Sequence, residues 1–216
     1  MFCHVIGYQY KNTYFVAMTL SSGLNKQVTI AVPDNPPRII LGIDPGTNIM
    51  GYAILVCVNK ETRLLVMDVV KNLKEPDPIE KLKVIFQRTE KLIVSHKVTE
   101  LAIEDPFYGK NVQSMLKLGR AQGMAIAAAL SHNLPVHQYA ARKIKQSITG
   151  NGSSSKEQVA AMLMRLLGIK ESPEYLDATD ALAVAMCHFN QRIPMVGDDK
   201  VNSWKAFIAK NPARMK

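Results

Sequence analysis

The order of its apolar segments constrains the fold of this chain more than any other feature. Three β-rich runs follow one another and are separated by turn residues, and after them predicted helices alternate with two further short apolar runs. Strands in succession, followed by alternating helices and strands, indicate an α/β sheet covered by helices. The expected strands are 38–44, 50–58, 62–70, 99–105 and 134–140, and the expected helices are 77–96, 111–133, 141–148, 155–169 and 174–190.

The length and composition predict one substantial domain with a tail at each end. The chain has 216 residues, of which 47% are hydrophobic, and that is enough to bury a single core. We expect the domain to span residues 38–190 and a C-terminal tail to span 191–216. Residues 1–37 end in the proline-rich stretch "VPDNPPR", which is typical of a linker. The sequence favours neither an ordered nor a poorly ordered N-terminal extension, and no chemistry is visible in it.

Cysteine usage and hydropathy predict a cytoplasmic protein. The three cysteines are far apart and form no C-x-x-C pair, which argues against disulfides and zinc and favours a reducing compartment. No apolar run reaches the roughly 18 residues of a membrane span, and the first residues make a poor signal peptide. We therefore expect no contact with a membrane.

Four acidic residues lie in an unusual context. Asp44 ends the first predicted strand and Glu104 ends the fourth, where a carboxylate is costly unless it is paired or binds a metal. Asp177 and Asp180 are three residues apart, so they share one face of the last helix. Functional groups in open α/β sheets gather at the carboxyl ends of strands, so the four acids can converge there. Together they would repel one another unless cations lay among them.

Oxygen ligands of this kind suit Mg²⁺ or Mn²⁺. Two such ions about 4 Å apart can activate water and stabilise the leaving oxygen in phosphodiester hydrolysis. Each acid alone also has an ordinary explanation, because a strand-end Asp is often a turn residue and Asp177 could be solvated or cap its helix. Asp105 is expected to point away from Glu104, Asp68 is expected at the surface, and the five histidines are scattered along the sequence. The combination favours a metal site.

A long segment without acidic residues follows Glu104. No Asp or Glu occurs from Pro106 to Lys156. The basic residues of this segment are Lys110, Lys117, Arg120, Arg142, Lys143, Lys145 and Lys156. They predict a positive surface that binds nucleic-acid phosphates with an affinity that falls as salt rises, and the net charge of +9 agrees. Phe107 could stack on an unpaired base or belong to the core, and the loop "TGNGSSSK" could bind phosphate or be merely flexible.

The long helix carries a narrow stripe of small and apolar residues. Its members are Leu116, Gly119, Gly123, Ile126, Ala127 and Leu130. Such a stripe could pack on the sheet, or it could pack on the same helix of a second subunit.

Four stretches together resemble the RuvC family of Holliday-junction resolvases. They are "ILGIDPGTNIMGYAI", "LAIEDPFYGKNVQSMLKLGRAQGMAIAAAL", "YAARKIKQSITGNGSSSKEQVAAML" and "DATDALAVAMCH". The resemblance runs from about Arg38 to Asn190, in the order of the family. In one respect the chain differs, since 37 residues precede the similar region, and an upstream start, an added segment and a native extension all remain open.

The resemblance implies an RNase H-like fold with a central mixed five-stranded sheet flanked by helices. It also implies a homodimer, joined through the 111–132 helix, that cuts four-way DNA junctions by paired symmetric nicks with Mg²⁺, for which Mn²⁺ would substitute, at two ions per site. RuvA and RuvB, the branch-migration proteins, are the implied partners. By the same resemblance, Asp44, Glu104, Asp177 and Asp180 are metal-binding and catalytic, and Phe107, Lys110, Arg142, Lys145 and Lys156 contact DNA.

Three other functions remain as alternatives. An actin-like ATPase or sugar kinase also begins with a strand and a G-I-D-x-G-T turn, but it needs a longer two-domain chain. A related RNase H-like nuclease could act on RNA or on another DNA structure. A binding module without catalysis would bind junctions whether or not metal is present.

Overall fold

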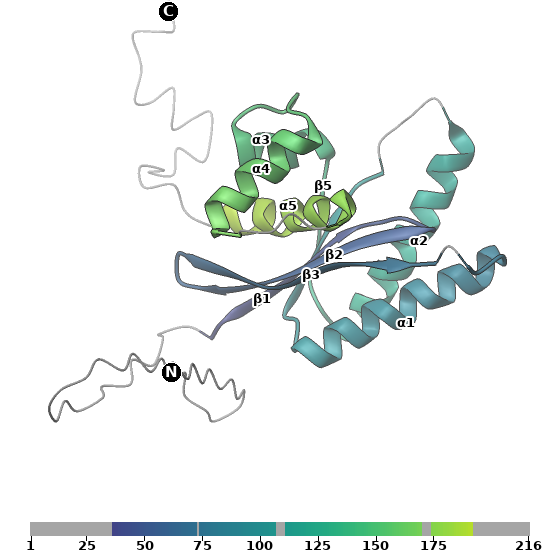
Figure 1. Ribbon diagram of the computed structural model, residues 1–216. Coiled ribbons are helices and arrows are strands. Elements are labelled where there is room, and N and C mark those ends of the chain that lie inside the picture. Colours follow the sequence, from purple (N-terminus) through teal and green to yellow (C-terminus); the bar gives the residue numbers. More distant parts are fainter. Residues whose placement is uncertain (1–35, 73, 107–110, 170–173, 192–216) are drawn as a thin grey trace, which may run out of the picture.

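Five strands form one mixed sheet at the centre of the protein (Figure 1). The structure is a computed structural model, and it describes residues 36–72, 74–106, 111–169 and 174–191. The strands are β1 (Arg38–Asp44), β2 (Ile49–Val58), β3 (Glu61–Lys71), β4 (Glu100–Glu104) and β5 (Val136–Tyr139), in the order β3-β2-β1-β4-β5. The first three strands form an antiparallel meander, and β4 and β5 continue the sheet parallel to β1. The expected α/β fold with a mixed five-stranded sheet is confirmed.

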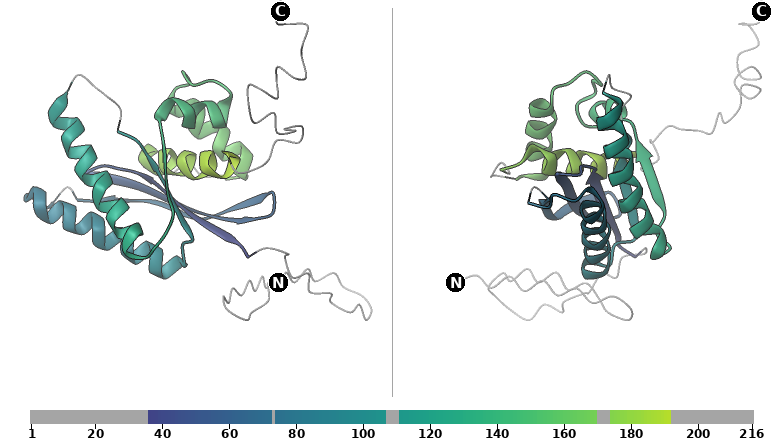
Figure 2. Two further views of the ribbon diagram at one scale, coloured as in Figure 1. Left: turned by 180° about the vertical axis from the view of Figure 1, so that it is seen from behind. Right: turned by 90° about the vertical axis from the view of Figure 1, so that its right-hand side faces the viewer.

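Helices cover both faces of the sheet (Figure 2). One face carries α1 (Pro78–His96) and α2 (Val112–Ser131), and the other carries α3 (Ala141–Thr149), α4 (Lys156–Leu167) and α5 (Leu176–Gln191). The predicted helices and strands are all present, with ends that differ by a residue or two. Helix α4 begins after Ser155, which caps it in a capping box with Gln158.

The two helical layers make two hydrophobic cores because neighbouring strand residues point to opposite faces. In β1, Ile40 packs in the core with α5, whereas Leu41 and Ile43 pack in the core with α1 and α2. All three side chains are fully buried. The face that a residue of β1 occupies therefore decides which helical layer it meets.

Helix α5 lies directly on the sheet and is buried on nearly all sides. A helix that is apolar all round is typical of a core element, and the residues of α5 that approach β1 most closely at Gly42, Ala181 and Ala185, are small. The close approach also requires Gly42 of β1, where an added Cβ would lie 2.3 Å from the carbonyl oxygen of Ala181. The alanine-rich sequence of α5 is thus explained by its distance from the strands.

Most of the small-residue stripe of α2 faces away from the sheet, although Ile126 packs partly buried against the core. The buried residues of this helix are Ala121, Gln122, Ala125, Ala128 and Ala129. On the opposite face, Leu116 and Leu130 are 53% and 58% exposed, and among the described residues no atom outside the helix's own backbone lies within 4 Å of a Cβ added at Gly119 or Gly123. The alternative in which the stripe covers the sheet is therefore wrong for these residues, because α2 presents its alanine face to the core.

Most of the expected N-terminal extension, 1–37, and of the expected tail, 191–216, lies outside the described residues, so these boundaries remain predictions. Among the helices that the structure describes, none is both long and apolar enough to cross a membrane.

Candidate metal centre

Two of the predicted acids lie side by side at one edge of the sheet. Asp44 is the last residue of β1, and Glu104 is the last residue of β4. The two strands are parallel neighbours whose final aligned pair is Ile43 with Ile103, so the two carboxylates follow at the same strand ends. The sheet therefore positions both acids, as the sequence predicted from the strand ends.

Helix α5 brings the other two acids to the same place. Asp177 and Asp180 lie in its first turns, and Gly51 of β2 makes room for them. Gly51 is aligned with Asp44 in the sheet, and an added Cβ at Gly51 would lie 1.9 Å from the carbonyl oxygen of Asp177. Asp44, Asp177 and Asp180 each offer a carboxylate oxygen, and these oxygens all lie within 4.8 Å of one another.

The electrostatics of the cluster call for cations. Burial, together with the charges of Glu104 and Asp180, raises the pKa of Asp44 to about 8. Burial and the charge of Asp180 raise the pKa of Glu104 to about 7, although Lys156 and Lys145 oppose that rise. Carboxylates that repel one another in a buried site are the donor set that a hard divalent cation satisfies. The residues present therefore fit Mg²⁺ or Mn²⁺.

These pKa values predict how stability depends on pH. The ordinary pKa values of Asp44 and Glu104 are 3.8 and 4.5, so between about pH 4 and pH 8 the folded protein holds protons that the unfolded chain releases. We expect the free energy of unfolding of the metal-free protein to fall by on the order of 2–4 kcal/mol as pH rises through this window. Urea unfolding with a chelator across this range measures the fall.

Asp44→Asn should remove most of this pH dependence, and Mg²⁺ should do the same for the unchanged protein. Asp68→Asn is the matched control, because Asp68 is exposed on β3 and should leave the dependence unchanged. A metal-free protein whose stability is flat or rises between pH 5 and pH 8 would contradict the prediction.

Lys156 is in direct contact with one of the acids. It is the first residue of α4, and its amino group forms an ion pair with the carboxylate of Asp180. Although burial opposes the effect, the hydrogen bond to Asp180 raises the pKa of Lys156 above its ordinary value. The sequence did not predict this pair, because nothing in the spacing of the two residues indicates that α4 and α5 bring them together.

The other predicted DNA-contacting residues are divided between α3 and residues outside the described ranges. Lys145 is partly buried on α3, close enough to Glu104 to lower its pKa, and Arg142 is exposed at the start of the same helix. Phe107 and Lys110 lie outside the described residues. Asp105, which the sequence excluded from the site, accepts a hydrogen bond from Gln122 of α2 instead.

A second group of possible metal ligands lies at the other end of the sheet. Ligand atoms of Glu100, His137 and His188 lie within 4.8 Å of one another. Both oxygens of Glu100 already have partners, one in Arg38 at 2.6 Å and one in His188 at 2.7 Å. Because a guanidinium lies beside this carboxylate, the group is unsuited to a further cation.

A mixed sheet of this strand order, with carboxylates gathered at the ends of its strands, is the arrangement expected of a metal-dependent nuclease with an RNase H-like fold. The chain matches the family model described as crossover junction endodeoxyribonuclease RuvC over residues 40–188. It belongs to the RuvC family.

Relatives and a solved structure agree with this assignment. The crossover junction endodeoxyribonuclease RuvC of Cytophaga hutchinsonii is 51% identical over 186 residues, which cover 85% of this chain and 91% of the relative. The enzyme of the same name from Bacteroides fragilis is 52% identical over 181 residues, covering 83% of this chain and 96% of the relative. The structure of T. thermophilus RuvC in complex with a Holliday junction substrate is similar with a TM-score of 0.65 at 31% identity, and the similarity covers 70% of this chain and 92% of that one.

Proposed function

We propose that this protein is a structure-selective endonuclease that resolves four-way DNA junctions by paired, symmetric, Mg²⁺-dependent nicks during recombination and repair. The observation that carries the proposal is the convergence of Asp44, Asp177 and Asp180 at the end of β1 in a chain of the RuvC family. The likeness to a RuvC structure solved with a Holliday junction substrate supports a junction as the substrate.

In this proposal Asp44, Glu104, Asp177 and Asp180 hold two Mg²⁺ ions, for which Mn²⁺ can substitute. When bound, the ions activate the attacking water and stabilise the charge on the leaving oxygen. The chain contributes rigid placement: Asp44 and Glu104 are held by the sheet, and the two acids of α5 are held by the contact of that helix with Gly42 and Gly51. Ligands on strands and a buried helix keep their separation better than ligands on loops.

The basic residues near the acids would bind the DNA backbone. Lys156 and Lys145 are the two whose charges act on the acidic cluster, so they suit the phosphates next to the scissile bond. Arg142 and Lys110 would contact phosphates further away, and Phe107 would stack on a base at the crossover.

Replacing Lys145 should change how junction binding depends on salt. We expect Lys145→Ala to weaken binding and to reduce the slope of log affinity against log salt by about one, since one phosphate contact is lost. Fluorescence anisotropy with a labelled junction and chelator, over a series of salt concentrations, measures the slope. Lys60→Ala is the control, because Lys60 is exposed in the turn between β2 and β3, at the end of that hairpin away from Asp44. An unchanged slope for Lys145→Ala would contradict a phosphate contact by Lys145.

We propose a homodimer that forms through the exposed stripe of α2. A two-fold dimer places two identical sites on opposite strands of a junction that is itself nearly two-fold symmetric. The glycines of the stripe would allow two helices to approach closely. Leu116 and Leu130 are large apolar side chains that are exposed in the single protomer, and a second subunit would cover them.

A bulky charge on this stripe should separate the subunits. We expect Gly123→Arg to sediment as a monomer where the unchanged protein sediments as a dimer, because the side chain would be forced between the helices. Analytical ultracentrifugation measures the mass. Lys91→Arg is the control, because Lys91 is an exposed residue of α1. A dimer that persists in Gly123→Arg would place the interface elsewhere.

The cellular setting is proposed from the family resemblance. RuvA and RuvB are the proposed partners, which would present the junction to this enzyme, and the cytoplasm is the proposed location.

Cleavage of an end-labelled four-way junction beside a linear duplex of the same sequence, with Mg²⁺ or with chelator, tests the function. Symmetric Mg²⁺-dependent nicks in the junction alone are the expected result. Equal cutting of both substrates would indicate a general nuclease. Binding without cutting, across several junction sequences, would indicate a binding module, and saturable ATP binding would favour the actin-like alternative.

A further inference from the structure

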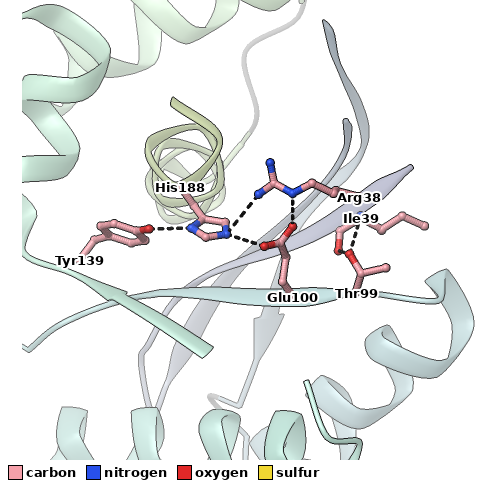
Figure 3. A network of polar contacts seen from close by, with 6 residues as sticks. All are labelled: Arg38, Ile39, Thr99, Glu100, Tyr139 and His188. Carbon is pink, nitrogen blue, oxygen red and sulfur yellow. Dashed lines mark hydrogen bonds and ion pairs between the residues drawn. The ribbon is translucent and has the colours of Figure 1, made fainter. Parts of the chain in front are cut away.

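A buried polar network joins the starts of β1 and β4 to the last turns of α5 and to Tyr139 of β5 (Figure 3). The Nε atom of Arg38 donates to Oε1 of Glu100 at 2.6 Å, and Oε2 of Glu100 lies 2.7 Å from Nε2 of His188. The hydroxyl of Tyr139 lies 2.6 Å from Nδ1 of the same imidazole, and the ring of His137 stacks on it at 4.4 Å. Glu100 and His188 are almost completely buried.

Glu100 is the acceptor at the centre of the network. An ionised carboxylate can only accept hydrogen bonds, so Nε2 of His188 donates to it, while Nδ1 pairs with the hydroxyl of Tyr139. Burial alone would raise the pKa of Glu100, but the hydrogen bonds from His188 and Arg38 lower it to about 2. Glu100 is therefore held ionised between the guanidinium of Arg38 and the imidazole of His188.

Each element that carries a candidate metal ligand also carries a member of this network at its other end. β1 runs from Arg38 to Asp44, and β4 runs from Glu100 to Glu104. In both strands the separation is even, so each pair lies on one face of the sheet. This is the face on which α5 packs, because Ile40 and Ala102, at even positions of the same strands, belong to the core formed with α5.

The third element, α5, repeats the arrangement. His188 follows Asp177 by eleven residues, close to three turns at about 3.6 residues per turn, so both lie on one side of the helix. The closest approaches between α5 and the strands are at Gly42 and Gly51, and larger apolar side chains such as Leu182 complete the contact. Apolar packing is not directional, so the hydrogen bonds at His188 add a directional restraint on the rotation and height of the helix.

We propose that Arg38, Glu100, His188 and Tyr139 are positioning residues, which fix the rotation and height of α5 against β1 and β4 and thereby set the spacing of the four carboxylates at the opposite end. The inference rests on the proposed metal site. Asp177 and His188 are about 16 Å apart along the axis of α5. Because the helix turns as one rigid element, a small rotation about its axis at His188 turns Asp177 through the same angle.

Mn²⁺ binding without DNA, followed by the electron paramagnetic resonance signal of the free ion, tests this inference on the full chain. His188→Leu removes both hydrogen bonds of the imidazole, and we expect it to weaken Mn²⁺ binding about tenfold, as when partners that orient metal ligands are lost. His188→Gln can keep the donor to Glu100, so it should recover part of the affinity. Phe189→Leu is the control, because Phe189 is the buried neighbour of His188 on α5 and lies outside the network.

An unchanged affinity in His188→Leu, or an equal loss in Phe189→Leu, would overturn the inference. If His188→Leu does not fold, His188→Gln and Tyr139→Phe decide: weakened binding in both supports the network, and wild-type binding in both refutes it. Failure of the metal site itself has a different signature. In that case the unchanged protein would not bind Mn²⁺, or Asp44→Asn would bind it equally well. Either result would refute the metal site and, with it, the positioning role.

Discussion

Asp44→Asn should lower the rate of junction cleavage by roughly a thousandfold or more, because a ligand that contributes several kcal/mol to the transition state is lost. Junction binding should stay close to that of the unchanged protein, because the substitution leaves Lys145, Lys156 and Arg142 in place. Single-turnover cleavage in Mg²⁺ and anisotropy in chelator measure the two quantities separately.

The substitution is nearly isosteric, so a loss of folding is not expected to explain the loss of cleavage. Above about pH 6 the metal-free variant should even be more stable than the unchanged protein, since the carboxylate whose pKa lies near 8 has been removed. Asp68→Asn makes the same chemical change at an exposed residue of β3, and this variant should cleave the junction at the normal rate. Cleavage by Asp44→Asn at that rate would show that Asp44 holds no essential metal.

Gly51→Ala should damage both the fold and the site. The added methyl group would lie 1.9 Å from the carbonyl oxygen of Asp177, so the first turn of α5 must move away from β2. Overpacking of this kind costs about 1–3 kcal/mol of stability. A shift of about 1 Å in a catalytic group can lower the rate by about a hundredfold. Urea unfolding and single-turnover cleavage of the same preparation measure the two effects.

Gly123→Ala separates this steric effect from the general effect of replacing glycine. Among the described residues, no atom outside the helix's own backbone lies within 4 Å of a Cβ added at Gly123, so at a protein concentration too low for the proposed dimer the protomer should gain up to about 1 kcal/mol from the higher helix propensity of alanine. A Gly51→Ala variant as stable and as active as the unchanged protein would mean that α5 does not need its close approach to β2.

Local patterns in the sequence were sufficient to predict the strands and helices and to single out the four acids as candidate ligands. The strands and helices have clear periodicity, and Asp44 and Glu104 are recognisable because each interrupts an apolar run at its end. The convergence of these acids with Asp177 and Asp180 followed from a general property of α/β sheets rather than from any local signal.

Long-range pairings were not predictable in this way. Glu100 and His188 looked ordinary in the sequence, one at the start of a short strand and the other near the end of a helix, and only the packing of α5 on β4 brings them together. The ion pair of Lys156 with Asp180 depends in the same way on how α4 lies against α5. The orientation of α2, with its alanines inward, was left open because both faces of that helix carry small apolar residues.

The spacing between the acids and the polar network has a consequence for how this chain can change in length. One inserted or deleted residue within β1 or β4 would turn one of the paired side chains to the opposite face of the sheet. One such change in α5 between Asp177 and His188 would rotate the two residues apart by about 100°. Insertions and deletions should therefore accumulate in the connecting loops, while these three segments keep their lengths in functional relatives.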